Sequence, residues 1–260
     1  MPLHPTVLVI GGSDSSGGAG VSRDLRTLHD LDVHGVAVIT AVTAQTNTSV
    51  RSINLVPQGA IRDQIETALA SNRIHAIKIG MLGSKRAVEA VALSLPVRGQ
   101  VPIVLDPVLA ASSGRALIDD DARTALVELL FPRATIITPN AVEAAGLLGE
   151  PVVTDAATLE SYALRLINQG PRAVLLKGGH AEGEDSIDIF VSADRDVSRL
   201  CGPRMCGTLR GTGCALASAI AAGLARELSL IDACRDGKRY IMGLFEQAFP
   251  AGRAELRRFV

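Results

Sequence analysis

Short β-branched runs alternate with helix-like segments along almost all of the 260 residues, and this alternation restricts the fold most. The runs that predict buried strands are Thr6–Ile10, Val36–Thr40, Ala76–Ile79, Ile103–Asp106, Thr135–Thr138, Ala173–Lys177 and Ile187–Val191. Helical patterns occupy Ile61–Ser71, Ser84–Leu95, Asp119–Phe131, Asn140–Leu148, Asp155–Asn168 and Leu230–Ala248. Strands that alternate with helices form mainly parallel sheets with helices on both faces. We therefore predict a single α/β domain over residues 1–260, a three-layer sandwich around a mostly parallel sheet.

The composition excludes several classes of function. Aromatic residues make up 3% of the chain and tryptophan is absent, so stacking platforms for single-stranded nucleic acid are not expected. A formal net charge of −1 provides no basic field for DNA or RNA. The longest apolar helical stretch, around residues 215–225, is too short to cross a bilayer. Four cysteines without CxxC spacing fit a reduced compartment. We expect a cytoplasmic protein with no nucleic-acid or membrane partner.

A glycine turn opens the apolar helical stretch near the C-terminal end of the chain. It reads Arg210-Gly211-Thr212-Gly213-Cys214 and runs directly into Ala215–Ile220. Glycines let a backbone approach a ligand closely, and a helix N-terminus directs free N–H groups and a positive dipole end at an anion. Cys214 would lie in the first helical turn, where a lowered thiol pKa is expected. A plain helix cap and a small core cysteine explain the same residues equally well.

Polar residues also follow the first two predicted strands. The segment Gly11–Gly20 is a glycine-rich loop that matches neither a Walker A loop nor a dinucleotide fingerprint, and it leads to a helix that carries Asp24. Gln45 follows the second strand; its amide has a donor and an acceptor that can pair with an aminopyrimidine edge. Each of these features is also consistent with an ordinary solvent-exposed loop.

Charged residues follow three later strands, at the edge where α/β sheets bind ligands. Asp106 and Glu143 are carboxylates that can hold Mg²⁺ through water beside a phosphate. Asn140 and Glu143 have the spacing of a capping box, which is the structural alternative for this pair. Lys177 could reach a phosphate or could be a solvated residue of a turn.

An ordered set of motifs resembles one known family. The motifs are Gly11–Gly20, Ile39–Gln45, Lys78–Leu82, Leu105–Gly114, Thr138–Asn140 with Glu143-Ala144, Lys177–His180 and Gly211–Cys214. Together they resemble the hydroxymethylpyrimidine/phosphomethylpyrimidine kinases of thiamine biosynthesis, which belong to the ribokinase-like superfamily. The resemblance extends from about residue 6 to residue 226.

This resemblance implies a ribokinase-like fold and an ATP- and Mg²⁺-dependent phosphorylation of 4-amino-5-hydroxymethyl-2-methylpyrimidine and of its monophosphate. The residues it implies for the pyrimidine pocket are Gly12, Asp24, Gln45, Met81 and Val108. Those implied for the nucleotide and the metal are Asn140, Lys177, Arg210 and Thr212, with Asp106 and Glu143 as Mg²⁺ ligands. Cys214 would act as a base or would shape an oxyanion hole with Gly211 and Gly213. A homodimer is also expected.

The chain departs from the family pattern just before the glycine turn. The family commonly reads Thr-Lys-Asn-Thr-His there, whereas this chain has Cys206–Arg210, in which Arg210 restores a positive charge. Two alternatives therefore stay open: a pyridoxal or pyridoxine kinase, and a catalytically weak pyrimidine-binding sensor of the same fold.

Overall fold

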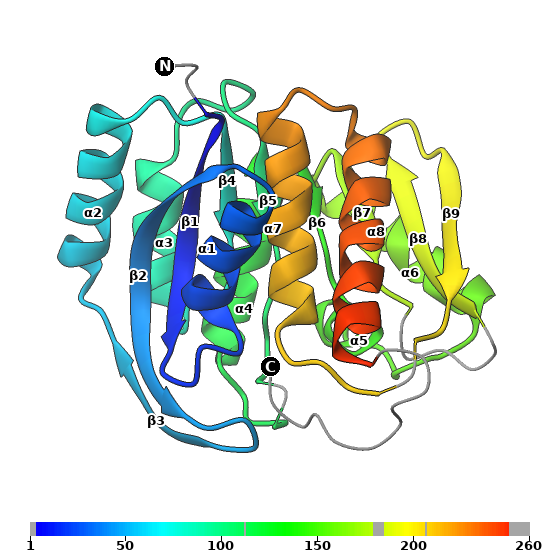
Figure 1. Cartoon of the computed structure of the whole chain (residues 1–260). Helices are drawn as coiled ribbons and strands as arrows, with labels where there is room; N and C mark the ends of the chain where they lie inside the picture. Colours follow the sequence, from blue (N-terminus) through cyan, green and yellow to red (C-terminus); the bar gives the residue numbers. More distant parts are fainter. Residues whose placement is uncertain (1–3, 112, 179–184, 206, 250–260) are drawn as a thin grey trace.

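A single mixed sheet forms the centre of the computed structural model, which describes residues 4–111, 113–178, 185–205 and 207–249 (Figure 1). The strand order in this nine-stranded sheet is β3-β2-β1-β4-β5-β6-β7-β8-β9. The strands are β1 Thr6–Asp14, β2 His34–Gln45, β3 Val50–Leu55, β4 Ala76–Ile79, β5 Ile103–Leu105, β6 Ile136–Ile137, β7 Ala173–Leu176, β8 Asp185–Ser192 and β9 Val197–Pro203. The prediction of an α/β fold with a central sheet is confirmed.

The six central strands β2, β1, β4, β5, β6 and β7 run parallel, as predicted. The outer strands β3, β8 and β9 are antiparallel to their neighbours. Strands β3 and β9 are not indicated by the sequence, because they lie at the edges of the sheet and are largely exposed, so they lack a continuous apolar run.

Helices cover both faces of the sheet (Figure 1). One face carries α1 Gly20–Asp30, α7 Thr212–Ala225 and α8 Leu230–Ala248. The other carries α2 Gln58–Ser71, α3 Lys85–Ser94, α4 Asp120–Ala125, α5 Ala141–Leu148 and α6 Ala156–Leu166. Three short turns, Leu126–Leu130, Phe131–Arg133 and Ile167–Gln169, extend α4 and α6. The predicted helix over Asp119–Phe131 is therefore an α-helix that continues as a π turn.

Alternate residues of β1 supply the two cores. Val7 and Val9 pack in the cluster with α7 and α8, whereas Leu8 and Ile10 pack in the cluster with α2 and α3. This division follows from the two-residue period of a strand, and it explains why a strand buried on both faces is apolar throughout.

Helix α7 is buried on nearly all sides, between α1, α8 and the sheet. Every residue from Ala215 to Ala225 is buried. The contact with α8 is close: a Cβ added at Gly237 would lie 3.1 Å from side-chain atoms of Leu216 and of Ile220. Tight packing of small residues therefore fixes the N-terminus of α7 relative to the sheet. Among the described residues, no helix is both long and apolar enough to cross a membrane.

Candidate active site

The glycine turn before α7, here called the anion loop (Arg210–Cys214), lies against the glycine-rich loop that follows β1. Gly211 has φ +71°, and a Cβ at this position would overlap the carbonyl oxygen of Gly18. Helix α7 begins at Thr212, so its first N–H groups have no partner within the helix and its positive dipole end faces the same point. The local geometry suits an anion, as the sequence predicts.

A lysine and two carboxylates meet next to this loop. Lys177 Nζ lies 3.1 Å from Asp106 Oδ1 and 3.9 Å from Glu143 Oε2. Asp106 Oδ1 also accepts a hydrogen bond of 3.2 Å from Thr138 Oγ1. A Cβ added at Gly213 would lie 3.2 Å from Lys177 Nζ and 3.7 Å from Asp106 Oδ2. The fold therefore brings the N-terminus of α7 into contact with the predicted phosphate- and metal-binding residues.

The electrostatics of this cluster follow from its burial. Burial raises the pKa of Glu143 to about 7, although the charge of Lys177 opposes the increase. For Lys177, burial acts to lower the pKa, but the carboxylates of Asp106 and Glu143 outweigh it and raise the pKa above its ordinary value. Lys177 therefore carries its positive charge at neutral pH.

The backbone around Lys177 is held by a second charged pair, which the sequence does not reveal. The Gly178 N–H donates to Asp188 Oδ1 at 3.0 Å, and Asp188 Oδ2 lies 2.9 Å from Lys238 Nζ. A Cβ at Gly178 would overlap the carbonyl oxygen of Ile187. The end of β7 is therefore fixed by β8 and α8, and no local pattern in the sequence links these residues.

Asn140 caps α5, as expected from the spacing. Its Oδ1 accepts a hydrogen bond of 2.9 Å from the Glu143 N–H, and Glu143 Oε2 accepts one of 2.8 Å from the Asn140 N–H. This capping box fixes the Glu143 carboxylate beside Lys177. The capping prediction is confirmed, while contact between Asn140 and a nucleotide stays a prediction.

Asp24 differs from the expectation that it lines the substrate pocket. Its side chain is fully buried, and its two oxygens accept 2.8 Å hydrogen bonds from Lys78 Nζ and Ser218 Oγ. The three residues come from α1, β4 and α7, so they join these elements in the core below the anion loop. A buried carboxylate needs such partners, and here they leave it no exposed surface for a ligand.

The thiol of Cys214 also departs from the sequence-based expectation. Burial raises its pKa to about 11, even though the charge of Lys78 and a hydrogen bond from the Gly20 backbone act to lower it. The effect of the helix N-terminus on a thiol is smaller than the desolvation at this position. The predicted lowered pKa is therefore wrong, and Cys214 is a neutral thiol at pH 7.

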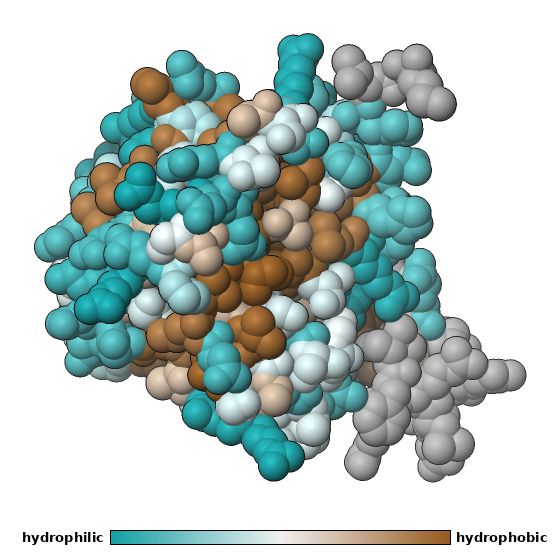
Figure 2. Space-filling model, turned by 90° about the vertical axis from the view of Figure 1, so that its left-hand side faces the viewer, coloured by the Kyte–Doolittle hydropathy of each residue, from teal (hydrophilic) through white to brown (hydrophobic). Residues whose placement is uncertain are grey.

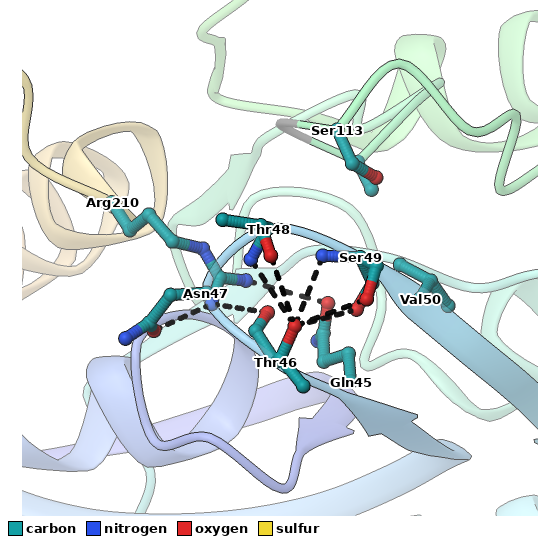
Figure 3. Close-up of a pocket in the computed structure, with 9 residues that line it drawn as sticks. Gln45, Thr46, Asn47, Thr48, Ser49, Val50, Ser113 and Arg210 are labelled. Atoms are coloured by element: carbon teal, nitrogen blue, oxygen red, sulfur yellow. Dashed lines mark hydrogen bonds between the residues drawn. The ribbon is translucent and has the colours of Figure 1, made fainter.

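Figure 3 shows Arg210 among residues of the turn between β2 and β3. Its guanidinium lies 3.3 Å from Asp14 Oδ2 and donates to Gln45 Oε1 at 3.3 Å. Asp14 is a further organising residue: it accepts from the N–H groups of Ser16 and Ala19 at 2.8 and 2.9 Å. The sequence-based assignment of Arg210 to the nucleotide is thus not reflected in its contacts. These contacts join positions far apart in the chain, which no local pattern indicates.

A pocket opens between this turn and the segment after β5. Its lining residues are Gln45, Thr46, Asn47, Thr48, Ser49, Val50, Ala111, Ser113 and Arg210 (Figure 3). Gln45 is therefore available to a ligand in this pocket, while its pairing with a pyrimidine stays a prediction. Cys214 and Asp106 are not among the lining residues, so this pocket is separate from the cluster around Lys177.

Three other residues expected around the pyrimidine, Gly12, Met81 and Val108, do not line this pocket. A Cβ added at Gly12 would lie 2.9 Å from Met81 Sδ, so any larger residue at position 12 would require the Met81 side chain to move. The carbonyl oxygen of Met81 accepts a hydrogen bond of 2.7 Å from Thr40 Oγ1. Val108 is partly exposed, and its N–H donates to the carbonyl oxygen of Asp106 at 2.9 Å. Gly12, Met81 and Val108 therefore lie at the carboxyl ends of the adjacent central strands β1, β4 and β5.

Comparison with known proteins agrees with this geometry. A family model described as phosphomethylpyrimidine kinase matches residues 14–257. The chain belongs to this family. It is 40% identical over 234 residues to the hydroxymethylpyrimidine/phosphomethylpyrimidine kinase of Rhizobium meliloti (strain 1021), which covers 90% of this chain and 88% of that protein. The resemblance deduced from the motifs is confirmed, and the chain is a member of a kinase family.

Solved structures confirm the predicted ribokinase-like sandwich. The phosphomethylpyrimidine kinase of Clostridium difficile 630 aligns with a TM-score of 0.80 and 33% identity, covering 93% of this chain and 99% of that one. The pyridoxal kinase of Staphylococcus aureus, solved with AMP-PCP and pyridoxal, aligns with a TM-score of 0.86 and 27% identity. That alignment covers 99% of this chain and 92% of the pyridoxal kinase. The fold is therefore shared by kinases of two heteroaromatic alcohols.

Proposed function

We propose that this phosphomethylpyrimidine kinase family member transfers phosphate from ATP to 4-amino-5-hydroxymethyl-2-methylpyrimidine, and then to the resulting monophosphate. The observation that carries the proposal is the meeting of Lys177, Asp106 and the N-terminus of α7 at one point, with Gly213 between them. This arrangement combines a fixed positive charge with unpaired N–H groups. Phosphoryl transfer depends mainly on such positioning and charge stabilisation.

The chain's own groups have distinct tasks in this scheme. Lys177 neutralises charge on the transferred phosphoryl group, and the Asp106 carboxylate holds the lysine in place. The backbone N–H groups of Thr212, Gly213 and Cys214 stabilise the developing negative charge, as in an oxyanion hole. Because its thiol is neutral at pH 7, Cys214 acts by shaping this hole and does not take the hydroxymethyl proton.

The carboxylates near Lys177 fit Mg²⁺. In the described part of the chain, Asp106 Oδ2 accepts no hydrogen bond, and Glu143 Oε2 lies 3.9 Å from the same Lys177 ammonium. Hard oxygen ligands of this kind suit Mg²⁺, which usually keeps several waters and is shared with substrate phosphates. Asp106 and Glu143 would hold the ion, which when bound neutralises charge on the phosphates. The described residues contain no group of three or more His, Cys, Asp or Glu side chains placed for a metal.

Gln45 favours the pyrimidine over pyridoxal. An amide pairs with an amine and a ring nitrogen side by side, whereas the phenolic edge of pyridoxal presents different groups. Pyridoxal kinase activity is the second candidate, since pyridoxal kinases share this fold at 27% identity.

A coupled ADP-release assay with Mg-ATP tests these assignments. The hydroxymethylpyrimidine, its monophosphate and pyridoxal are compared at equal concentrations. We expect turnover on both pyrimidines and a kcat/KM for pyridoxal at least about tenfold lower. Turnover on pyridoxal alone would replace the proposal by the second candidate. Tight pyrimidine binding without ADP release would indicate a sensor.

We propose that β2 and β3, the strands on either side of the pocket-lining turn, form the interface of the expected homodimer. Figure 2 shows apolar side chains gathered on the side of the molecule that carries β2, β3 and α2 in Figure 1. Val42 on β2 and Leu55 on β3 are 51% and 48% exposed. A second copy of the chain would cover such an apolar face. Light scattering after size-exclusion chromatography tests this, with Val42→Lys expected to shift a dimer toward monomer. The cytoplasmic location stays a prediction.

A further inference from the structure

Arg210 connects three parts of the site that are far apart in the sequence. One of its terminal nitrogens donates to Ser16 Oγ at 2.8 Å. The same nitrogen donates to the Thr46 carbonyl oxygen at 3.0 Å and to Asn47 Oδ1 at 3.1 Å (Figure 3). The other donates to Asp14 Oδ2 and to Gln45 Oε1, each at 3.3 Å. The anion loop, the loop after β1 and the turn between β2 and β3 are therefore tied together by one guanidinium.

The space around this guanidinium is restricted. The Arg210 side chain is 17% exposed, and that of its partner Asp14 is 1% exposed. A Cβ added at Gly18 would lie 3.1 Å from the same terminal nitrogen that binds Ser16. Arg210 therefore has a defined position rather than the freedom of a surface side chain.

The chemistry of this contact determines the orientation of the Gln45 amide. A guanidinium has only donors and always carries its charge, so the amide atom that faces Arg210 must be the oxygen. The amide nitrogen then points away from Arg210, and within the described part of the chain it has no hydrogen-bond partner. Gln45 lines the pocket, so it offers the pocket a free N–H donor.

We propose that Arg210 is a positioning residue that acts through Gln45 and so determines substrate specificity. It keeps the amide nitrogen directed at the substrate, and this selects a heteroaromatic ring with an acceptor nitrogen beside its amino-bearing carbon. The inference rests on the proposed function, in which Gln45 contacts the pyrimidine. A neutral side chain with both donor and acceptor at position 210 would leave the amide free to turn over.

The test compares two substrates that differ at one atom. One is the hydroxymethylpyrimidine, and the other is an analogue in which the ring nitrogen next to the amino-bearing carbon is replaced by C–H. For the unmodified protein we expect kcat/KM to fall about 10- to 100-fold with the analogue, because a buried N–H donor loses its partner. In Arg210→Gln, kcat/KM for the pyrimidine should exceed kcat/KM for the analogue by only about threefold or less. The KM for ATP should change by less than about threefold.

Three further variants separate positioning from a general structural effect. Arg210→Lys keeps a donor-only side chain and should retain most of the discrimination. Gln45→Ala should lose the discrimination between the pyrimidine and the analogue. Adding Arg210→Gln to Gln45→Ala should cause no further loss of discrimination, since Arg210 acts through Gln45. Arg115→Ala is the matched control: Arg115 also holds the same turn, by donating to the Val50 carbonyl oxygen at 2.7 Å. It should leave the discrimination unchanged.

The possible outcomes separate this inference from the proposed function. If the unmodified protein does not phosphorylate the pyrimidine, the proposed function fails. If it does, but Arg210→Gln discriminates as well as the unmodified protein, the positioning role is wrong. A loss confined to the monophosphate substrate would also overturn it, because that result would mean that Arg210 contacts the phosphate directly.

Discussion

Gly211 of the anion loop packs directly on Gly18 of the loop after β1. Both the left-handed φ of +71° at Gly211 and the carbonyl oxygen of Gly18 exclude a side chain at this point. The two glycine-rich loops, almost two hundred residues apart in the chain, therefore form one surface.

The Gly211→Ala variant should lose at least about tenfold in kcat, because the added methyl displaces the N–H groups that the loop presents. Gly17→Ala is a matched control. Gly17 also has φ +71°, but a Cβ there would meet nothing within 4 Å. It should cost about 1 kcal/mol of folding free energy from backbone strain and leave kcat nearly unchanged. Steady-state kinetics and urea denaturation of both variants test this, and equal kcat values would contradict it.

Replacement of Lys177 by Ala should lower kcat by roughly 10²- to 10³-fold, as expected for loss of a group that stabilises transition-state charge. Lys177→Arg should retain more activity because it keeps the positive charge next to Asp106 and Glu143. Single-turnover kinetics at saturating ATP measure the effect on the chemical step. A kcat for Lys177→Ala within about threefold of the unmodified protein would exclude this role.

Cys214→Ala should lower turnover much more than it lowers nucleotide affinity, since the proposed role of Cys214 is to shape the oxyanion hole used in the transfer step. Isothermal titration with a non-hydrolysable ATP analogue, alongside kcat for the pyrimidine, separates the two effects. Unchanged turnover would remove Cys214 from the mechanism.

The raised pKa of the Cys214 thiol predicts slow alkylation at neutral pH. Only the thiolate reacts, and its fraction rises about tenfold per pH unit below a pKa of about 11. Iodoacetamide labelling of the Cys214 peptide should therefore accelerate from pH 8 to pH 10 without reaching a plateau, as followed by mass spectrometry. The exposed Cys201 shows in the same samples that the reagent is active. A Cys214 rate that has already levelled off at pH 8 would be inconsistent with the buried, neutral thiol.

The buried pair of Asp24 and Lys78 should dominate local stability. Asp24→Ala leaves the Lys78 ammonium buried without its partner and should lower the free energy of unfolding by about 3–5 kcal/mol. Asp24→Leu combined with Lys78→Met should recover much of this loss, since no charge is then left unpaired. The exposed pair of Arg62 and Glu66 is the control, and Glu66→Ala should cost about 1 kcal/mol or less. Urea denaturation gives the values, and similar losses for Asp24→Ala and Glu66→Ala would contradict the prediction.

Local patterns predicted the central sheet and most helices. The predicted helix at Leu230–Ala248 has the same bounds in the structure, and the capping box of Asn140 and Glu143 forms as its spacing indicates. These features depend on residues a few positions apart, through helical periodicity, strand burial and capping. The order of motifs likewise sufficed to identify the family.

The tertiary structure alone decided the partners and the electrostatics of the site. Arg210 pairs with Asp14, a residue 196 positions away, and its predicted contact with the nucleotide stays a prediction. Burial makes the Cys214 thiol neutral and takes Asp24 out of the pocket, although local sequence favoured the opposite for both. Desolvation and long-range hydrogen bonds depend on what the folded chain packs around each group, and no local sequence pattern contains that information.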